Sequence, residues 1–227
     1  MKNILFLPKF PFRLIYILLL VLVLFTINHE ATANLLVNGD FENGSFTGWT
    51  WTSTANSAGT AGMIPSVSSF GIIFREPFSK CFQVSPGTDT YHSGMGLEEG
   101  GTLTQTINLV SGMQYSISLN AAMINPGPGE LNDAGRIRVY INNILLWNWD
   151  INWIGSHVTV RNAYSGTYTA ASSGQYTFKL LFTRTYMAYA PFVNHYADNI
   201  SVTPIPEPAS IFILGLGGII GLKRSFT

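Results

Sequence analysis

Three tryptophans within seven residues form the most distinct candidate binding site in this sequence. Trp147, Trp149 and Trp153 stand among asparagine and aspartate side chains. A flat indole can cover the C–H face of a sugar ring, while amide and carboxylate neighbours bond its hydroxyls. The i, i+2 spacing places Trp147 and Trp149 on one face of a strand. The cluster predicts either a glycan-binding platform, to which Tyr186, Tyr189 and Tyr196 could add, or core packing, which we favour because aromatic side chains bury large areas.

Catalysis finds little support in the sequence. His92, His157 and His195 show no metal-binding spacing such as H-x-x-x-H, and there is no G-x-S-x-G nucleophile turn. Glu98 and Glu99 are adjacent, so on a strand they point to opposite faces and cannot flank one glycosidic bond. We therefore predict a protein that is not an enzyme. A polysaccharide-active enzyme that uses acids far apart in the sequence stays as an alternative.

The charge balance argues against a nucleic-acid partner. Residues 34–203 carry ten acidic and seven basic side chains, a net charge of about −3, and no basic patch. The chain has a single cysteine, Cys81, so it cannot form an internal disulfide. We expect Cys81 to be a buried or incidental thiol rather than a nucleophile.

Alternation of apolar and polar residues dominates the part of the chain between the two ends. Period two over five to eight residues predicts strands with one buried face. The residues predicted to face the core are Leu103, Ile107, Leu109, Tyr115, Ile117, Leu119, Ala121, Ile137, Val139, Ile141, Tyr176, Phe178, Leu180 and Phe182. Trp49 is also assigned to the core. Residues 55–95 are the weakest part, where only Gly71–Phe74 and Lys80–Val84 read as short strands. The prediction is an all-β fold, an antiparallel sandwich or barrel.

Turn signals separate the predicted strands. Ser111-Gly112 predicts a hairpin between the strands around Ile107 and Ile117. Asn142-Asn143 predicts a second hairpin, because asparagine tolerates positive φ.

Sequence motifs near the two ends of residues 34–203 indicate which kind of β-sandwich to expect. Near the start, Asn38–Glu42 reads N-G-D-F-E and is followed by Gly48-Trp49. Near the end, Tyr196–Val202 reads Y-A-D-N-I-S-V. These segments resemble the first and closing strands of carbohydrate-binding-module-like, galactose-binding-like jelly rolls. The resemblance implies one jelly-roll β-sandwich, a scaffold that hosts many functions.

The same resemblance implies a structural calcium ion. In those jelly rolls the terminal strands lie side by side, and their carboxylates bind Ca²⁺, which prefers six to eight hard oxygen ligands. Glu42 and Asp198 match the side-chain ligand positions, and Asp40 is a weaker match. The alternative is that these carboxylates accept backbone hydrogen bonds without a metal.

The N-terminus has the three parts of a secretory signal peptide. Lys2, Lys9 and Arg13 form a positive region, Leu14–Phe25 is almost wholly apolar, and Ala31-Thr32-Ala33 supplies the small-x-small cleavage pattern. We predict cleavage after Ala33. An uncleaved N-terminal anchor is the alternative.

The C-terminus reads as a sorting signal. Pro206-Glu207-Pro208 precedes the apolar run Ala209–Leu222 and the basic pair Lys223-Arg224. A helix of this length covers about 21 Å, short for a hydrocarbon core of about 30 Å. The three parts resemble the PEP-CTERM signal of Gram-negative bacteria, which implies processing by the membrane enzyme exosortase. A docked C-terminal helix is the alternative.

Together these features divide the chain into a signal peptide (1–33), a jelly-roll domain (34–203) and a PEP-CTERM signal (204–227). We expect an exported, non-enzymatic protein of the cell envelope or exopolysaccharide matrix, anchored transiently in the inner membrane. Its expected partners are an exosortase-type enzyme and a polysaccharide. Glycan binding through Trp147, Trp149 and Trp153 is the alternative function.

Overall fold

The computed structural model of the 227-residue chain describes residues 33–57, 66–68, 71–75, 79–87, 98–185 and 193–206. Residues Ala33–Ile205 form one compact unit. Most of the predicted signal peptide, Glu207, Pro208 and the apolar run after them lie outside the described residues, as do Tyr186 and Tyr189. Within the described ranges, no helix has the length and apolar character needed to cross a membrane.

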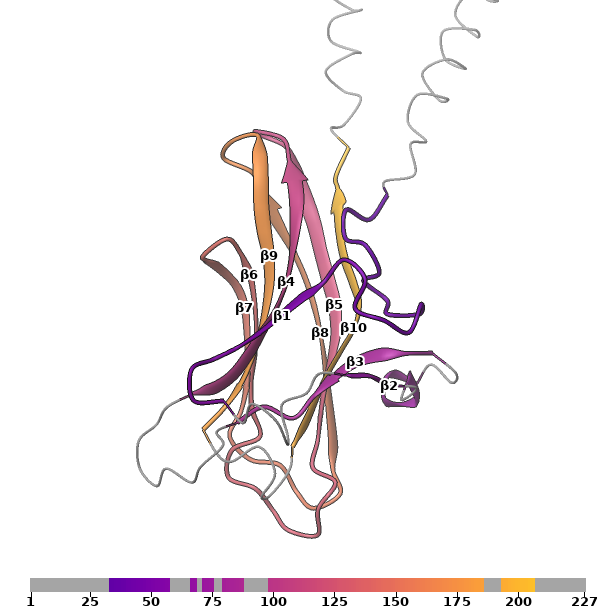
Figure 1. The fold of residues 1–227 in the computed structure, drawn as a ribbon, viewed down its shortest axis with the longest axis vertical. Helices are drawn as coiled ribbons and strands as arrows, with labels where there is room; N and C mark the ends of the chain where they lie inside the picture. Colours follow the sequence, from indigo (N-terminus) through magenta and orange to yellow (C-terminus); the bar gives the residue numbers. More distant parts are fainter. Residues whose placement is uncertain are drawn as a thin grey trace, which may run out of the picture. The chain divides into compact units, whose positions relative to one another are not determined.

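Ten strands build two five-stranded antiparallel sheets, and the only helix of the described residues is one 3-10 turn (Figure 1). The first sheet has the order β1-β4-β9-β6-β7, and the second has the order β2-β3-β10-β5-β8. The elements are β1 (Thr50–Ser53), β2 (Ser66–Ser68), η1 (Gly71–Phe74), β3 (Cys81–Val84), β4 (Glu99–Leu109), β5 (Gln114–Ile124), β6 (Gly135–Ile141), β7 (Ile144–Ile151), β8 (Thr159–Thr169), β9 (Gly174–Arg184) and β10 (Asn194–Pro204).

The pairing of the strands is that of a jelly roll. β3 pairs with β10, β4 with β9, β5 with β8 and β6 with β7, so that each pair is nested inside the one before it. Successive pairs alternate between the two sheets, which wraps a long antiparallel ribbon into a sandwich. The predicted antiparallel jelly-roll sandwich is therefore confirmed. The helices predicted to flank it fall outside the described residues.

The core lies between the sheets and follows the predicted alternation. All fourteen residues predicted to face the core are buried, and Trp49 is buried as well. Phe82 of β3 and Phe182 of β9 meet across the sandwich with ring centroids 4.8 Å apart. Phe41, from the N-terminal segment, packs between Trp49 and Phe82. Period two thus identified the inward faces, because each strand has one face on the core.

One predicted hairpin is wrong and the other is confirmed. β4 and β5, which Ser111-Gly112 connects, lie in different sheets. Instead, the Gly112 N–H donates to the carbonyl of Ala170, in the neighbouring β8–β9 connection, at 2.8 Å. The turn signal correctly predicts that the chain reverses direction at Ser111-Gly112. It cannot predict which strands pair, since a jelly roll pairs strands that are far apart in sequence. Asn142-Asn143 does close the β6–β7 hairpin, with Asn142 at a φ of 52°.

The region before β3 differs from the prediction in one element. Gly71–Phe74 forms the 3-10 helix η1 rather than a strand, whereas β3 is confirmed. Ile73 of η1 packs with Cys81, Ala122 and Tyr196, so the Cys81 thiol is buried. A four-residue apolar run has too little periodicity to separate a strand from a helical turn.

Candidate functional site

Trp147 and Trp149 lie on the edge strand β7, with their side chains on the face that packs against the core. On β7 they stand opposite Val139 and Ile137 of β6, whose side chains are in the core. Their rings stack at 5.9 Å between centroids, and Trp147 stacks in turn on Tyr164 of β8 at 5.7 Å. Trp149 is only 9% exposed and Trp147 is half-buried. The aromatic row therefore joins the two edge strands and seals the core between them.

A glycine makes room for this row. A Cβ placed on Gly166 of β8 would lie 2.2 Å from the Tyr164 hydroxyl, so the tyrosine ring lies along the strand over Gly166. Burial raises the pKa of the Tyr164 phenol. Both observations fit a tyrosine that packs in the core rather than one that offers its ring to a ligand.

Trp153 has the opposite environment. It is 56% exposed and lies in the loop of residues 152–158, which we call the Trp153 loop, with Val158 exposed beside it. Asn125, which is fully buried, fastens this loop to the neighbouring one. Its amide donates to the carbonyl of Gly129 at 2.5 Å and to that of Gly155 at 3.0 Å.

Backbone bonds hold the Trp153 loop further. Leu131 and Ile154 exchange two hydrogen bonds of 2.9 Å each, and the His157 N–H donates to the Gly127 carbonyl at 3.2 Å. His157 adopts a φ of 54°, which costs free energy for a residue with a Cβ. The loop is therefore built by specific contacts, and an exposed indole stands on an ordered base. Tyr196, by contrast, is buried in the second sheet, so the prediction that it could join an exposed platform is wrong.

The outer face of the first sheet carries a network of ion pairs, in which the buried Nη1 of Arg136 has no hydrogen-bond partner among the described residues. Arg138 binds Glu98 through both terminal nitrogens, at 2.5 and 3.0 Å, and its Nε donates to Asn148 at 2.7 Å. Arg136 pairs with Asp150 at 2.7 Å. The bond from Arg138 lowers the pKa of Glu98, and the same contact raises the pKa of Arg138. These groups bond to one another, so Glu98 is held as a carboxylate and not as an acid catalyst.

Glu98 and Glu99 do point apart, as their adjacency predicts. Glu99 is buried and accepts hydrogen bonds from Thr54 and from the side chain of Asn56, at the end of β1. Glu98 instead faces Arg136 and Arg138 on the outer face. The two carboxylates therefore lie in separate networks and cannot act on one bond.

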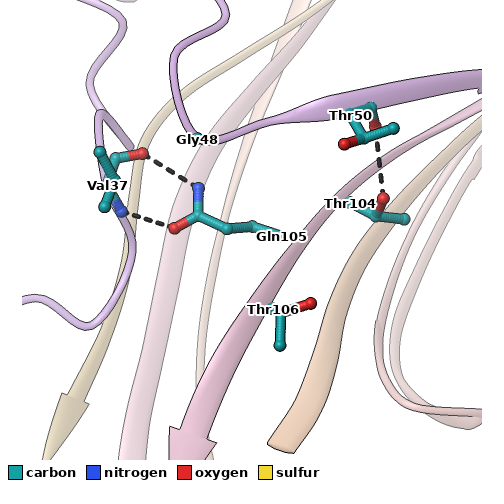
Figure 2. Close-up of a pocket in the computed structure, with 6 residues that line it drawn as sticks. All are labelled: Val37, Gly48, Thr50, Thr104, Gln105 and Thr106. Carbon is teal, nitrogen blue, oxygen red and sulfur yellow. Dashed lines mark hydrogen bonds between the residues drawn. The ribbon is translucent and has the colours of Figure 1, made fainter.

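A shallow pocket of about 360 Å³ lies where the N-terminal segment meets β1 and β4 (Figure 2). Its lining residues are Val37, Gly48, Thr50, Thr104, Gln105 and Thr106. The Gln105 amide is already used: its oxygen accepts from the Val37 N–H at 2.6 Å, and its nitrogen donates to the Val37 carbonyl at 3.0 Å. With no titratable side chain in its lining, the pocket offers hydroxyl and apolar contacts but no acid or base.

The residues predicted to bind calcium lie at the junction of the chain ends. The N-terminal segment runs beside β10, as the resemblance implied: the Ile200 N–H donates to the Gly39 carbonyl at 2.9 Å. Glu42 accepts from the Lys80 N–H at 2.7 Å, and the Lys80 ammonium donates to the Glu42 carbonyl at 3.1 Å. Asp198 is buried in β10 and accepts from the Asn199 N–H.

These contacts do not fit a three-carboxylate metal site. Across the described ranges, no three side chains among His, Cys, Asp and Glu are grouped so that they could hold a metal ion. Asp40, Glu42 and Asp198 are therefore not gathered into one ligand set, and the Lys80 ammonium already lies against a carbonyl of the loop. A calcium ion shared by Glu42 and Asp198, with carbonyl ligands, stays a prediction.

Sequence reasoning did not single out the buried polar cluster of His195, Arg184 and Asp133, which lies where β9 ends. His195 is fully buried, its Nε2–H donates to the Ala134 carbonyl at 2.7 Å, and its Nδ1 has no hydrogen-bond partner. Burial lowers the pKa of His195 to about 4. Beside it, the Arg184 Nε donates to the Asp133 carbonyl at 2.7 Å. No spacing links these residues in the sequence, so only the fold could bring them together.

Comparison with known proteins gives structural neighbours but no family. No protein-family model matches the chain, and no curated protein matches it. A family 61 carbohydrate-binding module in complex with β-1,4-galactotriose is similar over 77% of this chain and all of that one, with 10% identity and a TM-score of 0.46. A family 16 carbohydrate-binding module is similar over 75% of this chain and 99% of its own, with 20% identity and a TM-score of 0.42.

An enzyme is also among the neighbours. An arabinose-bound α-L-arabinofuranosidase matches 76% of this chain at 16% identity and a TM-score of 0.46, but only 26% of its own length is covered. At such identities and TM-scores, neither ligand nor activity can be transferred to this chain. The fold assignment therefore rests on the strand pairing described above.

Proposed function

We propose that the sandwich is a glycan-binding module of an exported protein of the cell envelope or exopolysaccharide matrix, and that Trp153 is its main contact with the sugar. The observation that carries the proposal is the exposure of Trp153 on the Trp153 loop, which Asn125 fastens from below. Of the three tryptophans in the cluster, it is the one classed as exposed, whereas Trp147 is half-buried and Trp149 is buried.

An ordered, exposed indole suits binding for energetic reasons. Tryptophan has only two rotatable side-chain bonds, so little conformational entropy is lost when a ligand covers it. A loop already held by hydrogen bonds also loses little entropy on binding. Exposed polar residues border the ring in sequence, namely Asn152 and His157, and can bond sugar hydroxyls.

The proposal is binding rather than hydrolysis. Hydrolysis of a glycosidic bond requires two carboxyl groups facing each other across the substrate. Glu98 and Asp150 are tied to Arg138 and Arg136, and Glu99 is turned into a separate buried network.

Export and sorting remain part of the proposal on sequence grounds. The signal peptide ending at Ala31-Thr32-Ala33 and the Pro206-Glu207-Pro208 motif support it. Ala33 and Pro206 are both exposed at the ends of the described part of the chain, where a processing enzyme could reach them.

A structural matrix protein with no dedicated ligand is the second candidate. The observation that favours it is the packing of Trp147 and Trp149 against the core, which removes two of the three indoles from a binding surface.

The test is retention of the full-length protein on exopolysaccharide from a producing host, compared among variants. Trp153→Ala should weaken retention about tenfold, which corresponds to about 1.4 kcal/mol, with the melting temperature unchanged. The control is Leu145→Ala, which removes another exposed apolar side chain and should bind normally. Equal retention by wild type and Trp153→Ala would refute glycan binding through this residue and favour the structural role.

A further inference from the structure

Both ends of the described domain leave the sandwich at one end. The Leu35 N–H donates to the Val202 carbonyl, and the Ile205 N–H donates to the Gln114 carbonyl, both at 2.8 Å. The β4–β5 and β8–β9 connections lie at the same end, because Leu109 pairs with Gly174 in the first sheet and Gln114 with Thr169 in the second. We call residues 33–35, 109–114, 169–175 and 203–206 the terminal end; it is at the top of Figure 1.

The terminal end has no charged side chain. Its segments read A-N-L, L-V-S-G-M-Q, T-A-A-S-S-G-Q and T-P-I-P, with no Asp, Glu, Lys, Arg or His among them. Val110 is 54% exposed at its tip, and Ala171 is exposed beside it. Set back from the tip, the β6–β7 hairpin adds the exposed side chains of Ile144 and Leu145.

Several polar groups at the tip of the terminal end bond to one another. The Ser111 N–H donates to the Ser173 hydroxyl at 2.8 Å, and the Ser111 hydroxyl donates to the Ala171 carbonyl at 3.2 Å. The Val110 N–H donates to the Tyr115 hydroxyl at 2.8 Å. These bonds reduce the number of unpaired polar groups, and no ion of this end would have to be dehydrated when it approaches an apolar medium, which lowers the cost in free energy.

Charged residues gather toward the opposite end of the strands. Arg184 and Thr183, the last residues of β9, lie beside Asp133, Arg136 and Glu98. This end could not approach hydrocarbon without desolvating several ions. The two ends of one sandwich therefore differ in what they can contact.

Chain length links the terminal end to an apolar segment. Four residue steps separate Ile205 from Ala209, where the 14-residue apolar run begins, and they span at most about 14 Å. If that run lies in a bilayer, as the proposed sorting function requires, the end of the sandwich that carries Ile205 stays close to the lipid headgroups.

We infer that the terminal end docks on the surface of a lipid bilayer while the chain is anchored. The inference rests on the proposed sorting function. It also orients the glycan site. The Trp153 loop follows the end of β7 that lies beside the last residues of β9, whereas the terminal end contains the first residues of β9. The ten residue steps of β9 between them correspond to about 34 Å. The module would then hold Trp153 toward the matrix and Val110 toward the lipid.

The test uses full-length protein reconstituted into vesicles of phosphatidylethanolamine and phosphatidylglycerol. Ala171→Cys at the terminal end and Asn152→Cys in the Trp153 loop each receive an environment-sensitive fluorophore. The native Cys81 is buried, so the wild type serves as the unlabelled control. Nitroxide-labelled lipids should quench the probe at position 171 and leave the probe at position 152 unaffected.

A charge at the tip should release the domain from the lipid. Val110→Asp should abolish quenching at position 171, whereas the matched control Val158→Asp, at the opposite end, should not. Vesicle flotation separates the two ideas under test. If the protein floats with the vesicles but the two probes are both unquenched or equally quenched, the docking is refuted and the membrane anchor is kept. If the protein does not float, both the membrane anchor and the docking are refuted.

Discussion

At the scale of single residues, His195 couples the stability of the fold to pH. The imidazole is fully buried between the sheets, with Phe182 beside it and Nδ1 unbonded. Burial and, to a smaller extent, the nearby Arg184 lower its pKa from 6.5 to about 4, against the opposing effects of the Ala134 hydrogen bond and Asp133. An unfolded chain would take up this proton near its ordinary pKa, so acid favours unfolding.

We expect the free energy of unfolding to fall between about pH 6.5 and pH 4, because only the unfolded state binds the proton in that window. The contribution of His195 to this loss is about 3 kcal/mol. Urea unfolding at several pH values measures it, and His195→Gln should flatten the pH dependence by that amount. Identical pH profiles for the two proteins would show that another group carries the acid sensitivity.

Calcium also acts at the residue scale. If Glu42 and Asp198 share an ion, calcium at a hundredfold excess over its dissociation constant should stabilise the fold by about 2.7 kcal/mol. Asp198→Asn should abolish this gain, and Asp150→Asn, which alters an exposed ion pair of the outer face, should keep it. Thermal melts with calcium and with chelator provide the measurement. A melting temperature that changes with neither calcium nor chelator would contradict the calcium site, and the Lys80 ammonium would then be the cation that contacts this loop.

At the scale of elements, the edge strands β7 and β8 depend on the row Trp149–Trp147–Tyr164. Each strand has a sheet partner on one side only, so the aromatic stack is what joins the two sheets along this edge. Gly166 permits the stack by leaving room for the Tyr164 hydroxyl.

Gly166→Ala should therefore displace Tyr164 and loosen the edge. We expect a loss of about 1–3 kcal/mol in unfolding free energy, typical of overpacking, together with a change in the near-ultraviolet circular dichroism of the tryptophans. Gly129→Ala is the control, since a Cβ there meets no atom within 4 Å. If both variants are equally stable and keep the same aromatic signal, the stack does not support the edge.

At the scale of the whole molecule, the described sandwich lies between two segments that we propose to be signals for export and sorting. Pro206 lies two residues after the end of β10, so a processing enzyme acting on Pro206-Glu207-Pro208 would cut close to the folded domain. Removal of the tail would also remove the segment that brings the terminal end to the bilayer.

We expect the released protein to lack both residues 1–33 and the tail beyond the Glu207 region. Changing Pro206 and Pro208 to Ala together should leave the protein unprocessed and bound to the membrane. Intact-mass measurement of protein recovered from the native host reports both ends. A full-length C-terminus on released protein would contradict the sorting hypothesis.

Much of the fold could be predicted from local pattern. Period-two alternation identified the buried faces of β4, β5, β6 and β9, because each strand has one face toward the core and one toward solvent. Asn142-Asn143 identified the β6–β7 hairpin, since the backbone conformation of a tight turn depends on the residues in it. The closing strand, β10, was predicted from the resemblance of Tyr196–Val202 to the closing strand of known jelly rolls.

Other features depended on contacts between distant residues. Ser111-Gly112 could not show that β4 and β5 enter different sheets, because strand partners in a jelly roll are set by packing of the whole chain. Nor could the spacing of the tryptophans separate Trp149, which is buried opposite β6 and stacked on Trp147, from Trp153, which is exposed to solvent. Local pattern was enough to establish which faces are apolar, where the chain turns and which segments resemble export signals. The folded chain was needed to establish which aromatic rings are covered, that His195 is buried, and that both ends of the described domain lie at an end without charged side chains. Burial and proximity of this kind arise only when the two sheets close on each other.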